Sequence, residues 1–163
     1  LNMEMKSNNH NTILNEKKVI EKISKIFKCE YLYSGADVFS KLDGFLFKDD
    51  CIRGCFEVKV RKQTLSWFED YKSCMFSFNK IQDGSEVSKM FGIKFFIFIE
   101  TSDGHILSFQ ITDRKGRIVC PMNMRYQNLK KTSSFTKGQE KLITSAYLSL
   151  EDNPYLKIYK KQN

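Results

Sequence analysis

The sequence contains few of the residues that disulfide-rich, zinc-binding and histidine-dependent proteins need. It has two histidines and five cysteines in 163 residues, and no two cysteines form a Cys-x-x-Cys pair. A disulfide framework, a zinc knuckle, a histidine-rich metal site and a Ser-His-Asp triad are therefore not expected. We expect the thiols to be reduced and mostly buried. Any catalysis should depend on carboxylates and lysines.

Long apolar runs and linker-like segments are also absent from the sequence. The longest strongly apolar run, from Phe95 to Ile99, has five residues, whereas a helix needs about 20 to cross a bilayer. The first residues carry no apolar stretch of the secretory type. Two prolines and eight glycines leave little room for a low-complexity linker. We expect an intracellular protein, cytoplasmic or associated with the nucleoid, that does not enter membranes.

What the sequence does contain is enough apolar residues for one core and an excess of positive charge. A length of 163 residues with 41% hydrophobic residues predicts a single domain. We expect a flexible segment over residues 1–11 and one domain over 12–163, with a well-patterned core over 12–111 and a less clear part over 112–163. Lysine and arginine total 27 against 19 acids, which favours polyanions. Charge alone does not separate DNA, RNA and anionic lipid.

Apolar periodicity predicts elements in the order α-β-β-α-β-β, followed by a C-terminal extension. In chain order these are a helix over 13–28, strands over 42–48 and 52–61, a helical stretch over 64–82 with a break at Gly84, a short helix ending at Phe91-Gly92, and strands over 93–100 and 105–111. Further on, the pattern favours a short strand over 118–120, no structure over 123–138, a helix over 137–150 and a strand over 155–159. Glu16 lies on the apolar side of the first helix.

The two strands over 42–48 and 52–61 read as a hairpin with charged residues on one face. Because strand side chains alternate, Glu57, Lys59 and Arg61 share a face. With Lys48 opposite Ile52, residue 43 lies opposite residue 57, and their Cβ atoms are about 4.5–5.5 Å apart. The sequence therefore predicts two facing carboxylates on one side of a sheet.

Two facing carboxylates repel each other unless a proton or a cation lies between them. A site made of carboxylate oxygens, without cysteine or histidine, suits magnesium, for which manganese can substitute, and such an ion can bridge to a substrate phosphate. A nearby lysine, Lys59, can hold or deprotonate a water molecule. The pattern is that of a phosphodiester hydrolysis centre.

The run Leu42-Asp43-Gly44, followed by Phe56-Glu57-Val58-Lys59-Val60-Arg61, resembles the motif of the PD-(D/E)xK (restriction-endonuclease-like) nuclease superfamily, with leucine where the motif name has proline. The resemblance implies a mixed central sheet flanked by helices in the order α-β-β-β-α-β, with variations. It also implies metal-dependent cleavage of DNA and a homodimer. The spacing from Glu16 to Asp43 is similar to that of archaeal Holliday-junction resolvases, and residues 77–80 resemble small phage-type members.

Carried over by position, the resemblance implies roles for individual residues. Asp43 and Glu57 would bind the metal with the carbonyl of Val58, and Lys59 would be the catalytic base or an orienting cation. Glu16 would be an additional acid on the first helix. Nucleic acid would be contacted by Arg61, Gln63 and Lys80.

Several alternatives stay open from the sequence. Glu-x-Lys pairs are common on the solvent faces of hairpins, an acid in a first helical turn is favourable without any catalytic purpose, and Lys80 and Arg61 could be ordinary solvated charges. Most aromatic residues are expected in the core, with Trp67 or Phe68 exposed near the substrate. The basic stretch over 130–137 could be a loop or an arm that follows phosphates. The protein could be a DNA endonuclease, an RNA-directed nuclease, or a catalytically silent module that binds nucleic acid.

Overall fold

The chain forms a mixed α/β structure with two β-sheets. The computed structural model describes residues 2–34, 41–130 and 140–161. In chain order the elements are α1 (Asn2–Phe27), β1 (Glu30–Tyr33), β2 (Gly44–Lys48), β3 (Cys51–Val60), α2 (Leu65–Tyr71), β4 (Ser73–Ser77), α3 (Phe78–Phe91), β5 (Lys94–Glu100), β6 (Ile106–Gln110), β7 (Met122–Lys130), β8 (Glu140–Ser149) and β9 (Leu156–Tyr159). The mixed α/β class predicted from the sequence is confirmed.

The larger sheet is mixed, with strands in the order β1-β2-β3-β5-β6-β9. Strands β3 and β5 run parallel, and the other neighbours are antiparallel. A parallel pair needs a crossover connection, which α2, β4 and α3 supply here. The smaller sheet, in the order β4-β8-β7, is antiparallel. Strand β4 lies in the connection between β3 and β5 and is also a strand of the smaller sheet. The crossover therefore links the two sheets.

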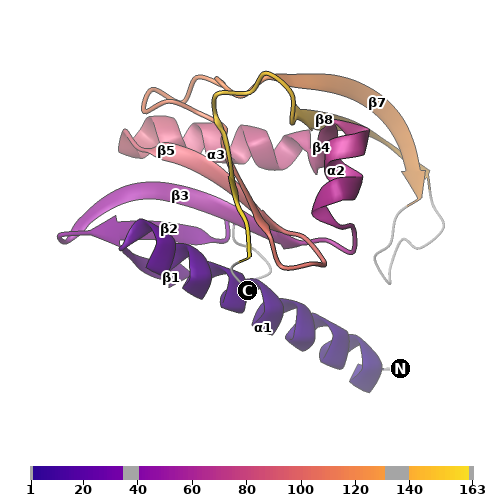
Figure 1. The fold of residues 1–163 in the computed structure, drawn as a ribbon, viewed down its shortest axis with the longest axis horizontal. Coiled ribbons are helices and arrows are strands. Elements are labelled where there is room, and N and C mark those ends of the chain that lie inside the picture. Colours follow the sequence, from indigo (N-terminus) through magenta and orange to yellow (C-terminus); the bar gives the residue numbers. More distant parts are fainter. Residues whose placement is uncertain (1, 35–40, 131–139, 162–163) are drawn as a thin grey trace.

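Helices cover both faces of the larger sheet (Figure 1). On one face, α1 packs its apolar stripe on Phe56 and Val58 of β3. On the other face, α3 and the smaller sheet pack around Phe95 and Ile97 of β5. All four of these side chains are fully buried, and each such burial contributes about 1.5–3 kcal/mol. Because strand side chains alternate, Glu57 points away from α1, toward the second layer.

Helix α1 is longer than the periodicity predicts. It begins at Asn2, not near residue 13, and ends at Phe27. Residues 2–11, which the sequence assigns to a flexible segment, are therefore helical. These first turns extend past the strands (Figure 1), which explains why they carry no apolar stripe. Within the described part of the chain, neither α1 nor any other helix is both long and apolar enough to cross a membrane.

Strand β1 is missing from the order predicted from the sequence. It pairs antiparallel with β2, from Glu30 opposite Phe47 to Tyr33 opposite Gly44. The strand has four residues and lies at the edge of the sheet. Its alternation of apolar and polar residues is too short to predict a strand from the sequence. Its addition gives the order α-β-β-β before the crossover, and it brings Tyr33 beside the hairpin.

The helix predicted over 64–82 is wrong in its middle. Helix α2 ends before Lys72, which has the left-handed φ of 64°, and residues 73–77 form β4. Cys74 and Phe76 are buried while Ser73, Met75 and Ser77 are more exposed. The buried residues therefore alternate as in a strand, although Met75 and Phe76 also continue the helical spacing from Phe68.

Gly84 does not break a helix as predicted but lies within α3. A Cβ atom at this position would lie 2.2 Å from the Phe95 ring. The glycine thus allows α3 to approach β5 closely. The predicted helix end at Gly92 is confirmed, since this residue has φ 64° and its N–H donates to the Ser88 carbonyl.

The C-terminal third differs most from the prediction. Residues 140–149 of the helix predicted over 137–150 form strand β8 between β4 and β7, and residues 122–130 form β7. Ile118 makes an isolated bridge with Thr112, so no strand forms over 118–120. The predicted closing strand is confirmed as β9. Apart from Lys130, the basic stretch over 130–137 lies within residues 131–139, outside the described part of the chain.

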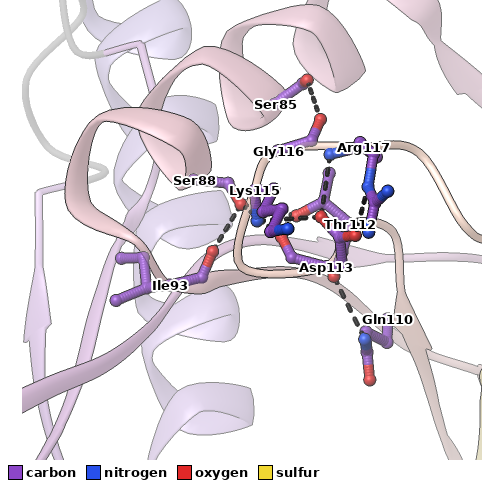
Figure 2. Close-up of polar contacts among 9 residues, drawn as sticks. All are labelled: Ser85, Ser88, Ile93, Gln110, Thr112, Asp113, Lys115, Gly116 and Arg117. Atoms are coloured by element: carbon purple, nitrogen blue, oxygen red, sulfur yellow. Dashed lines mark hydrogen bonds and ion pairs between the residues drawn. The ribbon is translucent and has the colours of Figure 1, made fainter.

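A buried polar cluster joins the end of α3 to the loop after β6 (Figure 2). The Ser88 hydroxyl donates to the Ile93 carbonyl and lies 2.7 Å from Thr112 Oγ1 and 2.9 Å from the Asp113 carbonyl. Thr112 Oγ1 also accepts a hydrogen bond of 3.0 Å from the Phe95 N–H. Ser88 and Thr112 are fully buried, and both hydroxyls have partners.

Candidate functional site

The candidate site lies where β2 begins beside β3. The register predicted at the turn is wrong, because Lys48 lies opposite Cys51, not Ile52. A bulge between Leu46 and Phe47 shifts the pairing by one residue, and Gly44 then lies opposite Phe56. At the far end of the hairpin the pairing therefore has the predicted register, and residue 43 lies beside residue 57.

Asp43 is buried just before β2 and is held by the backbone of β3. Its N–H donates to the Phe56 carbonyl at 3.1 Å, and its Oδ2 accepts a hydrogen bond of 2.8 Å from the Val58 N–H. Gly44 follows it because a Cβ atom there would lie 1.9 Å from the Leu32 carbonyl oxygen. The Asp-Gly pair within an apolar strand thus combines a fixed carboxylate with a close approach of β1.

Glu57 is fully buried and lacks hydrogen bonds. Its side chain has 0% exposure, and neither carboxylate oxygen accepts a hydrogen bond of ordinary geometry from the residues that the structure describes. Burial and then the neighbouring Asp43 carboxylate raise the pKa of Glu57 to about 8, while Lys80 acts in the opposite direction. A buried carboxylate without hydrogen bonds is costly unless a proton or a cation compensates its charge.

Lys80 supplies positive charge to this position from the first turn of α3. Its Nζ lies 3.0 Å from Glu57 Oε1 and donates a hydrogen bond of 3.0 Å to the Lys41 carbonyl. With a side-chain exposure of 38%, Lys80 reaches the carboxylate from the solvent side. It is therefore part of the site, and its position as an ion-pair partner differs from the free phosphate contact expected from the sequence.

Glu16 and Lys59 form an ion pair next to the two carboxylates. Lys59 Nζ lies 3.3 Å from Glu16 Oε1, and the Tyr33 hydroxyl donates a hydrogen bond of 2.9 Å to Glu16 Oε2. Burial, and then the charges of Glu16, Asp43 and Glu57, raise the pKa of Tyr33. All three acids are therefore close to the same phenol, and α1, β1 and β3 together fix the lysine.

The Val58 backbone also faces the carboxylates. Its N–H donates to Asp43, and the N–H and C=O of one strand residue point to the same side of the strand. Strand β2 begins at Gly44, opposite Phe56, so its ladder does not reach Val58. The Val58 carbonyl is thus directed toward Asp43, as its predicted role as a metal ligand requires.

The two other residues predicted to contact nucleic acid lie apart from the carboxylates. Arg61 and Gln63 follow β3 and line a separate pocket of about 250 Å³ with Trp67 and Tyr71. The Arg61 guanidinium donates a hydrogen bond of 3.3 Å to the Met75 carbonyl. The prediction that Trp67 or Phe68 is exposed holds for Trp67 alone, since Phe68 is buried.

The donor set suits a hard divalent cation that retains water ligands. Among the described residues, no group of three or more histidine, cysteine or acidic side chains could hold a metal ion together. Glu16 is engaged by both Lys59 and Tyr33. Asp43 and Glu57 each have one such contact, with the Val58 N–H and with Lys80, and they are the two acids that lie at the start of β2. Magnesium commonly binds to one or two carboxylates and keeps several waters. Glu57, whose buried oxygens accept no hydrogen bond of ordinary geometry from the described residues, fits that chemistry.

Sequence reasoning did not find Tyr33 as part of the site. Tyr33 belongs to a strand that the periodicity does not predict, and its contact with Glu16 joins residues 17 positions apart. Tyr31 and Tyr33 lie two residues apart, and nothing in the local sequence indicates which of them contacts Glu16. Lys80, by contrast, was found from its position after the hairpin.

The cysteines take no part in this site. Cys55, Cys74 and Cys120 are buried, whereas Cys51 is exposed and Cys29 is half-buried, and all five are free thiols. Burial raises the pKa of Cys55 and Cys74 to about 12. These two thiols therefore stay protonated and act as small apolar side chains.

Comparisons of the chain with protein-family models, with curated proteins and with solved structures find no match.

Proposed function

We propose that the protein is a divalent-metal-dependent nuclease of the PD-(D/E)xK type that hydrolyses DNA phosphodiester bonds. The observation that carries the proposal is Glu57, a fully buried carboxylate without hydrogen-bond partners among the described residues, next to Asp43. A group whose pKa is strongly perturbed by burial and a charged neighbour is typical of functional sites. The ion pair of Lys59 with Glu16 adds a fixed cation beside the two acids.

The arrangement of elements supports the same proposal. The PD-(D/E)xK motif is associated with the order α-β-β-β-α-β, and α1, β1, β2, β3, α3 and β5 follow that order. The α2–β4 segment is then an insertion within the crossover. The motif residues lie on β3 and at the start of β2, in the centre of the larger sheet. Both flanking helices contact β3.

Each residue has a role in this proposal. Asp43, Glu57 and the Val58 carbonyl would hold a magnesium ion, or manganese in its place. When bound, the cation supplies charge neutralisation for the phosphate and lowers the pKa of a water ligand. Lys59, an ammonium group that Glu16 keeps in place, would orient the attacking water and stabilise the negative charge that develops as this water loses its proton to solvent. Lys80 compensates the charge of Glu57 until a cation binds.

Cleavage assays with defined substrates test the proposal. Labelled duplex DNA, a four-way junction, single-stranded DNA and RNA are incubated with magnesium or manganese, and with chelator alone. We expect metal-dependent cutting of at least one DNA substrate, and a loss of roughly 100-fold or more in Glu57→Gln and Lys59→Ala. The control variant Lys48→Ala removes an exposed lysine at the other end of the hairpin and should cleave normally.

The outcomes separate the three hypotheses about function. Cleavage of RNA alone would contradict DNA as the substrate and would still support the proposed catalytic site. Salt-sensitive binding without cleavage, unchanged in Glu57→Gln and Lys59→Ala, would contradict the enzyme and favour a binding module. A homodimer, which would cut both strands of a duplex, predicts twice the monomer mass in light scattering.

A further inference from the structure

The pocket after β3 has the features of a binding site for an unpaired base. It has a volume of about 250 Å³ and is lined by one arginine, one glutamine, four aromatic residues and three residues of β4. The argument depends on Arg61, Gln63, Trp67 and Tyr71. Its lining residues do not include Asp43, Glu57 or Lys59. The pocket is therefore distinct from the candidate metal site.

Trp67 and Tyr71 form a stacked aromatic pair that lines the pocket. They are one helical turn apart on α2, and their rings are stacked at 5.0 Å with an interplanar angle of 10°. Their side chains are 44% and 53% exposed. Large aromatic rings are normally buried in a core, so two adjacent exposed ones are informative. Exposed rings of this kind serve as stacking platforms for nucleic-acid bases.

The polar groups in the pocket are available to a ligand. The Gln63 carboxamide makes no hydrogen bond to the residues that the structure describes, and no described carboxylate lies within 4.0 Å of the Arg61 guanidinium. Arg61 is oriented by its contact with the Met75 carbonyl. Carboxamide and guanidinium groups match the donors and acceptors of base edges.

The charge around the pocket favours a base over a run of phosphates. Helix α2 carries Glu69 and Asp70, both exposed, beside its aromatic residues. Acidic side chains repel phosphate, so this helix is a poor surface for following a nucleic-acid backbone. The combination of stacking rings, one arginine and one carboxamide instead suits the neutral base of a single nucleotide.

Two chain segments connect the pocket to the candidate metal site. Strand β3 runs from Glu57 toward Arg61, and β4 leads from Met75 to Lys80 at the start of α3. Four residues of extended strand span about 13 Å, which corresponds to about four stacked nucleotides at 3.4 Å each. A strand held at the carboxylates can therefore place a nearby base in the pocket.

We infer that this pocket binds an unpaired nucleobase, and that the substrate of the proposed nuclease contains single-stranded nucleotides close to the scissile phosphate. The statement about the substrate rests on the proposed function, whereas binding of the base does not. Stacking on Trp67 and Tyr71 provides the affinity, and Arg61 and Gln63 contact the base edge.

Intrinsic fluorescence tests the inference, because Trp67 is the only tryptophan in the chain. The protein is titrated in chelator with an oligothymidylate octamer, with an abasic strand of equal length and charge, and with a blunt duplex. We expect the octamer to quench Trp67 and the two other ligands to leave it unchanged. In Tyr71→Ala and Trp67→Ala, anisotropy of a labelled octamer should show binding that is roughly 5- to 150-fold weaker.

Tyr126→Ala is the matched control, because Tyr126 is an exposed tyrosine that does not line the pocket. Its affinity for the octamer should stay within about twofold of wild type. Equal quenching by the abasic strand, or unchanged binding in both pocket variants, would overturn the inference. Quenching without metal-dependent cleavage would support the pocket and contradict the nuclease, whereas cleavage without quenching would support the nuclease and overturn the pocket.

Discussion

Two buried polar clusters in the layer between the larger sheet and α3 differ in how their polar groups are satisfied. At the end of α3, Ser88 and Thr112 are fully buried and have partners on each other and on the backbone (Figure 2). At the start of β2, Glu57 is equally buried, yet its oxygens accept no hydrogen bond of ordinary geometry from the described residues. The first arrangement stabilises the fold, whereas the second leaves a buried carboxylate with Lys80 as its ion-pair partner among the described residues.

The largest effect that separates the two clusters should be on cleavage. In Asp43→Asn the side-chain oxygen can still accept the hydrogen bond from the Val58 N–H, but the negative charge is lost. We expect the catalytic rate to fall by roughly 100-fold or more, with little change in the fold. The control Asp113→Asn changes an acid of the other cluster, and its cleavage rate should match that of wild type. Equal losses in both variants would contradict the comparison.

Stability in chelator should respond to pH through Glu57. Its pKa is raised from 4.5 to about 8 by burial and by Asp43, so the folded state binds more protons than the unfolded state between these values. The free energy of unfolding contributed by this group therefore falls as pH rises from about 4.5 to about 8. Glu57→Gln should be more stable than wild type at pH 8, on the order of 2–4 kcal/mol, and equal to it near pH 4.

Urea unfolding of both proteins from pH 4 to pH 8, without metal, measures this difference. Glu86→Gln is the matched control, because Glu86 is an exposed glutamate paired with Lys41 at 3.4 Å. An exposed ion pair contributes little to stability, so the control should follow wild type at every pH. If Glu57→Gln were less stable than wild type at pH 8, the ionised Glu57 carboxylate would not be destabilising, and the account would be contradicted.

The satisfied cluster should show the opposite sign. Thr112→Val keeps the shape of the side chain but removes the acceptor of the Phe95 N–H and the contact with Ser88. Leaving a buried donor without a partner should lower the free energy of unfolding by about 1–3 kcal/mol, without an effect on metal affinity. Thermal unfolding of Thr112→Val and of Ser85→Ala, which loses a single part-buried bond to the Gly116 carbonyl, measures the cost. A stabilised Thr112→Val would contradict the account.

The smallest effect is expected at the tyrosine that holds Glu16. Tyr33→Phe removes the hydrogen bond to Glu16 Oε2 and leaves the Lys59 ion pair with one supporting contact fewer. We expect cleavage to slow by roughly tenfold, with an altered pH–rate profile because the position of the lysine is less fixed. Tyr31→Phe on the same strand, near Glu21, should leave both unchanged. An identical pH–rate profile in Tyr33→Phe would remove Tyr33 from the site.

The sequence predicted the candidate site better than it predicted the local pairing that builds it. The alternation of β3 identifies which side chains share a face, and the spacing from residue 43 to residue 57 brings the two acids together. The register at the turn was wrong by one residue, and the bulge at Leu46 and Phe47 corrected it. A bulge of this kind leaves no signature in apolar periodicity.

The error at β4 has a physical cause in its long-range pairing. Strand β4 pairs with β8, about 70 residues away in the chain, so no neighbouring segment indicates this pairing. Phe68, Met75 and Phe76 fit helical spacing, whereas Cys74 and Phe76 fit strand alternation, so the long-range partners decide between the two patterns. By contrast, β5 and β6 are joined by a short turn, and both are predicted correctly.

The central claim is that Asp43 and Glu57 bind one divalent cation, and titration calorimetry with manganese at pH 6 and pH 8 tests it most directly. In two buffers of different ionisation enthalpy, wild type should bind one ion, release a proton at pH 6, and bind more tightly at pH 8. Glu57→Gln should bind at least tenfold more weakly, and Thr112→Val should bind as wild type does. Absence of binding to wild type, or equal affinity in Glu57→Gln, would contradict the account.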